Sequence, residues 1–183
     1  MTIDHDARAV RAPATTSRGW TPVIALAGGI ALLVASEFLP ASVLPALAGD
    51  LGISEGTAGL AVAATAIAGA VTAPSIAVLL PRTDRRRVLV ALLVAGAVAN
   101  LAVALAPHFA VLLAGRLVLG IAIAGYWAFA LGVGTHAVPG RSGLVSAAIT
   151  FGVSVATVVG VPVASLVSDV IGWRAAFAGA AAL

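Results

Sequence analysis

Long apolar runs alternate with short polar segments along most of the chain. Five of these runs are long enough to cross the roughly 30 Å hydrocarbon core of a bilayer as α-helices, and a sixth is too short to cross. The pattern predicts an all-α integral membrane protein. Its five full spans are expected at 20 to about 45, 57–80, 88–106, 109–135 and 142–167, with a truncated sixth span at 175–183.

The polar segments between the runs are short enough to be tight loops at a membrane surface. Residues 1–19 are polar and are expected to form a disordered tail, which leaves 20–183 as one transmembrane bundle. Because the sixth span is incomplete, this bundle is expected to be a fragment of a larger one. The predicted loops are 46–56, 107–108 and 168–174 on one side of the membrane, and 81–87 and 136–141 on the other.

Arginine is distributed unequally between these two sides. Segment 81–87 carries four Arg, and further Arg residues lie in 1–19 and 136–141, whereas the opposite side carries Arg174. Short loops rich in Arg remain on the cytoplasmic side, so the N-terminus is predicted to be cytoplasmic. The absence of Lys and the abundance of Ala and Val favour a GC-rich bacterial gene, and therefore a multi-pass protein of the bacterial plasma (inner) membrane.

Composition excludes several classes of protein. Charged residues make up 9% of the chain, against about 25% in soluble domains. The pI of about 11.1 does not indicate nucleic-acid binding, because the positive-inside bias of the loops accounts for the basic residues. With no Cys, the chain has no disulfide framework and no Cys-based zinc site. It also lacks a P-loop motif, so we do not expect ATP to be the direct energy source. We expect neither a cofactor nor a metal site.

Two matched pairs of residues indicate an internal repeat. Pro162 follows Pro74 by 88 residues, and Arg174 follows Arg86 by the same 88. The repeat relates spans one to three to spans four to six. Because each unit has an odd number of spans, the units have opposite orientations. An inverted 3+3 repeat is typical of secondary transporters.

Several stretches carry a family resemblance that covers nearly all of the chain after residue 20. They are 37–54, Ala73-Pro74 with the Arg cluster, Gly115-Arg116 through Gly120, and Gly160-Val161-Pro162 with Gly172-Trp173-Arg174. Together they resemble the N-terminal half of a major facilitator superfamily transporter, most closely bacterial drug:proton antiporters of the arabinose/sugar-efflux and chloramphenicol-efflux type. The second and third stretches are similar to motifs A and B of that family. The chain departs from it at Pro81, where motif A has Asp, and at Leu119, where motif B has Gln.

The resemblance implies a six-span half of a major facilitator fold. It also implies a secondary transporter that exports small molecules of the drug, sugar or nucleoside class by alternating access, in exchange for protons. The expected partners are the substrate, protons, the lipid bilayer and a C-terminal six-span half that this chain lacks; nucleic acid is not expected. Two alternatives remain, a six-span half-transporter that dimerises and a non-functional fragment.

An intramembrane protease is a further, remote alternative. Gly140-Arg141-Ser142-Gly143 matches the G-x-S-G pattern of rhomboid proteases. The Ser would need a His base from a later helix, and no His follows His136 in the chain. We therefore expect no enzymatic activity.

Glu37 and Arg116 are the ionisable residues inside the predicted spans, and they lie at similar depth. A charge within a membrane normally faces a cavity or a partner, and the resemblance implies that spans one and four line the central cavity. Under the functional interpretation, Glu37 exchanges a proton or contacts a cationic substrate, and Arg116 tunes it. Under the structural interpretation, the two side chains form a pair that neutralises itself.

Aromatic and amide side chains are candidates for the substrate cavity. Arg116, Gly120, Ile123 and Trp127 fall on one helical stripe, and Tyr126 flanks that stripe. These aromatic rings are expected either to form a wall for an amphipathic substrate or to face lipid and neighbouring helices. Asn100 is expected to form a helix–helix hydrogen bond, with a substrate contact as the alternative.

Two further sets of residues are candidates for conformational change. Pro74 and Pro162 are expected to be helix bends that assist gating, or tolerated kinks. The loop that contains Arg82, Asp84, Arg85 and Arg86 is expected to lock the inner gate, or to bind lipid head groups as a topology determinant.

Overall fold

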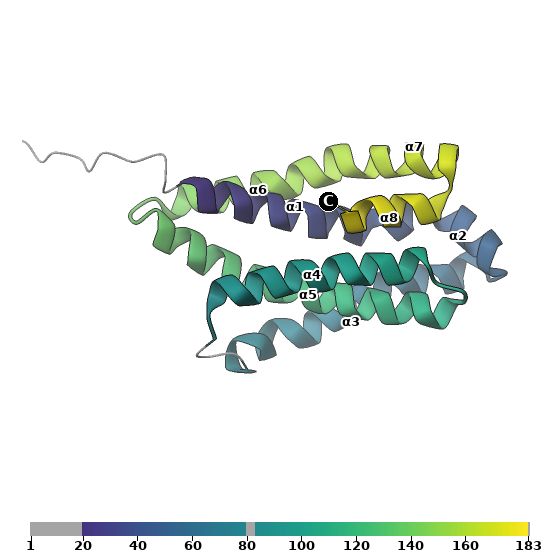
Figure 1. The fold of residues 1–183 in the computed structure, drawn as a ribbon, viewed down its shortest axis with the longest axis horizontal. Coiled ribbons are helices and arrows are strands. Elements are labelled where there is room, and N and C mark those ends of the chain that lie inside the picture. Colours follow the sequence, from purple (N-terminus) through teal and green to yellow (C-terminus); the bar gives the residue numbers. More distant parts are fainter. Residues whose placement is uncertain (1–19, 80–82, 183) are drawn as a thin grey trace, which may run out of the picture.

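The computed structural model describes residues 20–79 and 83–182 and shows a bundle of helices that run side by side (Figure 1). The expected tail at 1–19 and Arg82 lie outside the described residues. The helices are α1 (Trp20–Ser42), α2 (Leu44–Leu51), α3 (Glu55–Leu79), α4 (Arg85–Ala104), α5 (Phe109–Ala137), α6 (Ser142–Val155), α7 (Val161–Ile171) and α8 (Trp173–Ala182), with the π-helical stretch η2 (Ala156–Gly160) between α6 and α7.

Five helical segments of the described chain are long and apolar enough to span a membrane. They are α1, α3 as far as Ile76, α4, α5 and the continuous segment from Ser142 to Ile171. The helix α8 covers ten residues and corresponds to the predicted short sixth span. The prediction of an all-α membrane bundle with five full spans and a short sixth is therefore confirmed.

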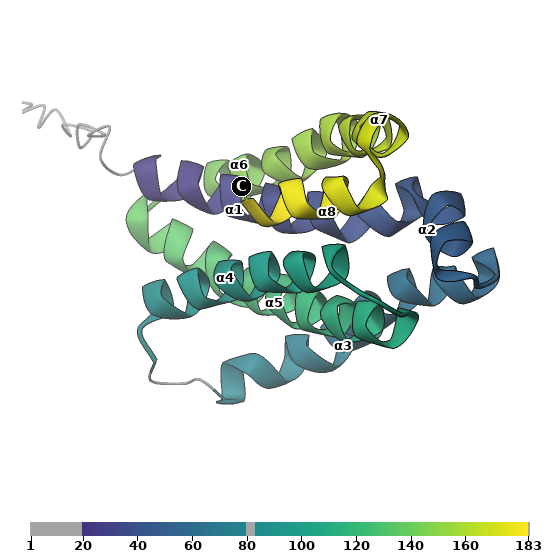
Figure 2. The ribbon, with the colours of Figure 1, turned by 45° about the vertical axis from the view of Figure 1, so that its right-hand side comes forward.

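The two repeat units exchange their first helices. Helix α5 packs against α3 and α4 of the first unit, whereas α1 packs against α6, η2, α7 and α8 of the second (Figures 1 and 2). The first helix of each unit thus occupies the corresponding place in the other unit. This arrangement is the inverted 3+3 repeat that the sequence predicts, and it is consistent with half of a major facilitator fold.

Glycines allow the main chains to approach closely where the units exchange helices. A Cβ on Gly120 of α5 would overlap the carbonyl oxygen of Thr65 on α3, and a Cβ on Gly152 of α6 would overlap the carbonyl oxygen of Ala27 on α1. Lipid chains are as apolar as Leu, so helix association in a membrane depends on this kind of close packing rather than on the hydrophobic effect.

The bundle has two ends, which we name by a residue at each. The Asp50 end contains α2, the connection between α4 and α5, and the turn between α7 and α8 (Figure 1). The Arg86 end contains the first turns of α1 and α4 and the connection between α5 and α6. A separate cluster of buried apolar side chains packs the bundle toward each end.

The segment after α1 is helical, which corrects the predicted loop at 46–56. Helix α1 ends at Ser42, and Val43 leaves helical geometry with φ −121° and ψ 16°. Pro45 then lies in the first turn of α2, where its missing N–H is not needed. Gly52, in the left-handed region at φ 63°, ends the helix.

Helix α4 begins within the Arg cluster, three residues before its predicted start at Val88. The Asp84 side chain accepts a hydrogen bond from the Arg86 main-chain N–H at 3.0 Å and so caps the helix. Arg85 and Arg86 therefore belong to the first turn of α4 and not to a loop, which corrects the prediction for these two residues.

The turn between α7 and α8 is also shorter than predicted. Helix α7 continues to Ile171 and α8 begins at Trp173, so one residue replaces the expected turn at 168–174. That residue is Gly172, at φ 93° and ψ 155°. A residue with a side chain would be strained there.

Candidate functional site

A groove with a volume of about 500 Å³ runs along the contact between α3 and α5. Glu37 of α1 reaches it as a half-buried side chain, and Trp127 of α5 is 41% exposed there. The remaining lining residues are small, except for Ile123: Thr65, Ala66, Gly69, Ala73, Gly120, Ala124 and Ala128. The groove therefore presents a carboxylate and an indole on a surface formed mostly by small side chains.

Glu37 and Trp127 lie toward opposite ends of this groove. Gly120 approaches the main chain of α3 beside Thr65, and the Glu37 main chain accepts a hydrogen bond from Arg116, four residues before Gly120. Trp127 is seven residues beyond Gly120, or about 10 Å along the helix at 1.5 Å per residue. Three of the four residues of the predicted stripe, Gly120, Ile123 and Trp127, line the groove, and Arg116 does not.

Arg116 is completely buried, and it binds main-chain carbonyl groups. Its Nη1 donates to Ser36 O at 2.8 Å, its Nη2 to Glu37 O at 2.7 Å, and its Nε to Ala61 O at 3.3 Å. The guanidinium group of α5 thus joins α1 and α3. Hydrogen bonds to a charged group are stronger than neutral ones, so Arg116 fixes the position of the main chain that carries Glu37.

The side chains of Glu37 and Arg116 do not form the neutralising pair of the structural interpretation. Among the described residues, the ion pairs are Arg87–Asp84 and Arg174–Asp50. Three of the five guanidinium N–H donors bind main-chain carbonyl oxygens instead. Glu37 lines the groove instead.

Asn100 lies away from the groove. Its Nδ2 donates to Ser36 Oγ of α1 at 2.8 Å, the helix–helix hydrogen bond expected from the sequence. It lines a different hollow, of about 320 Å³, among α1, α4 and the end of α8. Its buried Oδ1 has no hydrogen-bond partner within the described part of the chain. The structure therefore does not bring Asn100 together with Glu37 and Trp127.

Tyr126 also faces away from the groove. It is 2% exposed, its hydroxyl donates to Leu26 O at 3.4 Å, and its ring lies over Gly29. Tyr126 therefore contacts α1, whereas its neighbour Trp127 lines the groove. Tyr126 instead lines a hollow of about 530 Å³ between α1 and α4, which Arg86 also borders.

The other candidate residues lie outside the groove or at its edge. Asp84, Arg85 and Arg86 are exposed at the Arg86 end of the bundle. Helix α3 continues through Pro74, whereas the regular α-helix is interrupted by η2 directly before Pro162. Within residues 20–79 and 83–182, no three His, Asp or Glu side chains gather closely enough to hold a metal ion.

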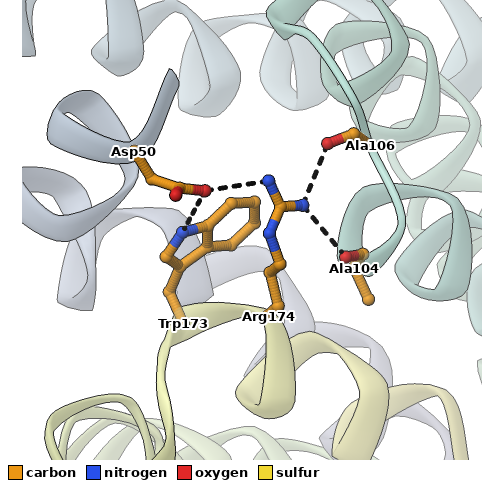
Figure 3. Close-up of polar contacts among 5 residues, drawn as sticks. All are labelled: Asp50, Ala104, Ala106, Trp173 and Arg174. Atoms are coloured by element: carbon orange, nitrogen blue, oxygen red, sulfur yellow. Dashed lines mark hydrogen bonds and ion pairs between the residues drawn. The ribbon is translucent and has the colours of Figure 1, made fainter. Parts of the chain in front are cut away.

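The sequence-based predictions missed a polar cluster at the Asp50 end (Figure 3). Arg174 Nη2 binds Asp50 Oδ2 at 2.8 Å, and Trp173 Nε1 donates to the same oxygen at 3.3 Å. Arg174 Nη1 donates to Ala104 O at 3.2 Å and to Ala106 O at 2.9 Å. This cluster connects α2, α8 and the carboxyl end of α4. The sequence did contain a signal for this cluster. Asp50 and Arg174 carry opposite charges, and both lie in segments predicted on the same side of the membrane.

Comparison with known proteins agrees with this architecture. Residues 19–183 match the model of the Major Facilitator Superfamily. The chain is 39% identical over 173 residues to a purine ribonucleoside efflux pump, NepI, of Escherichia coli O1:K1, covering 94% of this chain and 44% of that protein. It is 37% identical over 181 residues to NepI of Salmonella typhimurium strain LT2, covering 98% of this chain and 46% of that protein.

The chain spans less than half the length of these curated relatives. The family model nevertheless covers the entire bundle, from the start of α1 to the last residue of the chain. With its helical spans and its inverted repeat, the chain belongs to the Major Facilitator Superfamily.

Proposed function

We propose that this chain forms one wall of the substrate path of a proton-coupled efflux transporter for purine nucleosides. The observation that carries the proposal is the groove between α3 and α5, in which an ionisable carboxylate faces a largely apolar surface. The volume of about 500 Å³ is within the roughly 300–1,000 Å³ of small-molecule sites. The relatives named as purine ribonucleoside efflux pumps support the nucleoside class.

The hydrogen bonds of Arg116 support a coupling role for Glu37. A carboxylate at membrane depth favours the neutral form, whereas a nearby positive charge favours the ionised form. Because Arg116 binds carbonyl oxygens, it supplies its charge without engaging the carboxylate directly. In the proposed cycle, Glu37 takes up a proton when the groove opens outward and releases it when the groove opens inward.

The proposed orientation places the Arg86 end in the cytoplasm. Arg85, Arg86, Arg87 and Arg141 lie at that end in the described chain, and Arg174 lies at the other. Loops rich in Arg remain inside, so the N-terminus is proposed to be cytoplasmic in the bacterial inner membrane. A second six-span bundle would form the facing wall, either within one longer polypeptide or, as the alternative, from a second copy of this chain.

The test compares two Glu→Gln variants of the gene product that carries these residues. In everted membrane vesicles, uptake of radiolabelled adenosine driven by a pH gradient should fall at least tenfold in Glu37→Gln. The matched variant Glu55→Gln changes an exposed carboxylate at the start of α3, outside the groove, and should transport at the wild-type rate. Membrane levels of each variant are measured by immunoblot.

Two results would contradict this proposal. One is proton-driven uptake in Glu37→Gln at the rate of Glu55→Gln, which would make Glu37 structural. The other is an absence of proton-driven adenosine uptake by the unaltered protein. Glu37→Asp keeps the titrating group one methylene further back and should retain part of the activity.

A further inference from the structure

We infer that the two ends of the groove recognise the two parts of a nucleoside: Trp127 stacks on the base, and Glu37 accepts hydrogen bonds from the ribose hydroxyls. This inference rests on the proposed nucleoside substrate. It adds an orientation for that substrate and a reason for selecting ribonucleosides over free bases and sugar-modified analogues.

The spacing of the two side chains fits a molecule built from two linked rings. Trp127 lies seven residues, or about 10 Å, along α5 from Gly120, and Glu37, Gly120 and Trp127 line one groove. Small side chains on both walls, including Gly69, Ala73 and Ala124, leave room for flat rings along this length. A free base spans one end of such a groove, whereas a nucleoside spans both.

Trp127 has the chemistry of a stacking platform. Its indole is 41% exposed, and its neighbours in the groove on α5 and α3 are Ala124, Ala128 and Ala73. Aromatic side chains stack on nucleobases without regard to sequence, because every base has a π-face. Small neighbours allow a purine to cover the indole without displacing other side chains.

Glu37 has the chemistry of a ribose ligand. An ionised carboxylate accepts hydrogen bonds through two oxygens and donates none, which matches the two adjacent hydroxyl donors of a ribose ring. Thr65, the other polar side chain of the groove, already donates its hydroxyl to Ala61 O at 3.2 Å. Because Arg116 is bound to main-chain carbonyls, it leaves the Glu37 carboxylate available for the sugar.

A site that hydrogen-bonds a substrate hydroxyl discriminates strongly against analogues that lack it. We therefore expect adenosine to bind about tenfold more tightly than 2′,3′-dideoxyadenosine. Glu37→Gln should remove most of that preference, because the neutral amide is a weaker and single acceptor. Trp127→Leu should weaken adenosine and 2′,3′-dideoxyadenosine to a similar extent, because both present the same base.

The experiment is saturation-transfer difference NMR on the purified 183-residue chain in deuterated detergent, a method that detects weak ligands. Adenosine should receive saturation at its base protons and at its ribose H2′ and H3′ protons. In Trp127→Leu the base signals should decrease most, and in Glu37→Gln the ribose signals should decrease most. Glu55→Gln and Trp20→Phe are matched controls outside the groove and should retain the wild-type pattern.

The outcomes separate this inference from the proposed function. If adenosine gives no signal with the unaltered chain, both the nucleoside substrate and the inference fail. If adenosine binds but 2′,3′-dideoxyadenosine competes equally well, or Glu37→Gln and Trp127→Leu reduce the same protons equally, the orientation is wrong while the nucleoside substrate stands. Circular dichroism of each variant shows whether its helices remain folded.

Discussion

The two ends of the bundle use equivalent arginines in different ways. Arg174 follows Arg86 by 88 residues in the inverted repeat. At the Asp50 end, Arg174 binds Asp50 and the carbonyl groups of Ala104 and Ala106, so it connects three helices (Figure 3). At the Arg86 end, the Arg86 side chain is exposed and its main-chain N–H donates to the Asp84 cap, while Asp84 lies 3.7 Å from Arg87 Nε in the same turn.

The comparison shows that repeat-related residues need not share a structural role. Arg174 and Asp50 are each less than half exposed, whereas the Arg87 side chain is 87% exposed. At the Asp50 end, the contacts of Arg174 between helices add to apolar packing, whereas at the Arg86 end Asp84 and Arg87 make their polar contacts within one helical turn. In transporters with inverted repeats, one bundle rocks against the other. We expect the Asp50 end, whose helices are joined by the contacts of Arg174, to move as one body. We expect the exposed Arg85, Arg86 and Arg87 of the other end to contact lipid head groups or a facing bundle.

The largest expected difference between the two ends is their accessibility from the two sides of the membrane. The chain has no native Cys, so a maleimide that labels a single introduced Cys labels no other cysteine of the chain. Glu55→Cys, at the Asp50 end, should react with an impermeant maleimide in intact cells. Thr83→Cys, at the Arg86 end, should react after the cells are opened. The opposite pattern would overturn the proposed orientation.

The second largest effect concerns Arg116, which joins α5 to α1 and α3 near the Asp50 end. Arg116→Ala removes three charge-assisted hydrogen bonds and leaves a cavity. We expect a loss on the order of 3 kcal/mol in the free energy of unfolding. Arg116→Lys should recover part of it, because one ammonium cannot match the planar guanidinium at three acceptors. Unfolding in mixed micelles measures these changes, and a stability equal to wild type in Arg116→Ala would show that the three bonds contribute nothing.

A smaller difference is expected between Arg174→Ala and Arg87→Ala. Arg174 is partly exposed, so the loss of its hydrogen bonds and of its ion pair with Asp50 should cost about 1 kcal/mol. Arg87→Ala removes an exposed pair within one helical turn, and the change should stay below about 0.5 kcal/mol. Equal effects in the same unfolding assay would mean that the two ends are held together in the same way.

The spans were predictable because a membrane helix is recorded in the sequence as an unbroken apolar run. The ends of the helices were less predictable. Helix α2 contains Pro45 and Asp50, which are typical of loops, and packing of Leu47 into the buried cluster of the Asp50 end outweighs them. The start of α4 places Arg85 and Arg86 at a helix N-terminus, where positive charge is unfavourable, and the Asp84 cap offsets this.

The site was predictable where it depends on side chains within one helix. The spacing of Gly120, Ile123 and Trp127 correctly predicts a shared face. The partners of Arg116 were not predictable. Every residue has a main-chain carbonyl group, so the sequence does not show which of them Arg116 binds. For the same reason the sequence left a direct pair with Glu37 as one of two open interpretations.

The most direct test of the proposed substrate path is protection of a groove cysteine by substrate. Ala128 is exposed in the groove beside Trp127, so Ala128→Cys should react with a water-soluble maleimide in membranes that contain the gene product. Adenosine should slow this reaction several-fold while leaving the reaction of Glu55→Cys, outside the groove, unchanged. Reaction of Ala128→Cys at the same rate with and without saturating adenosine would contradict the assignment of the groove between α3 and α5 as the substrate path.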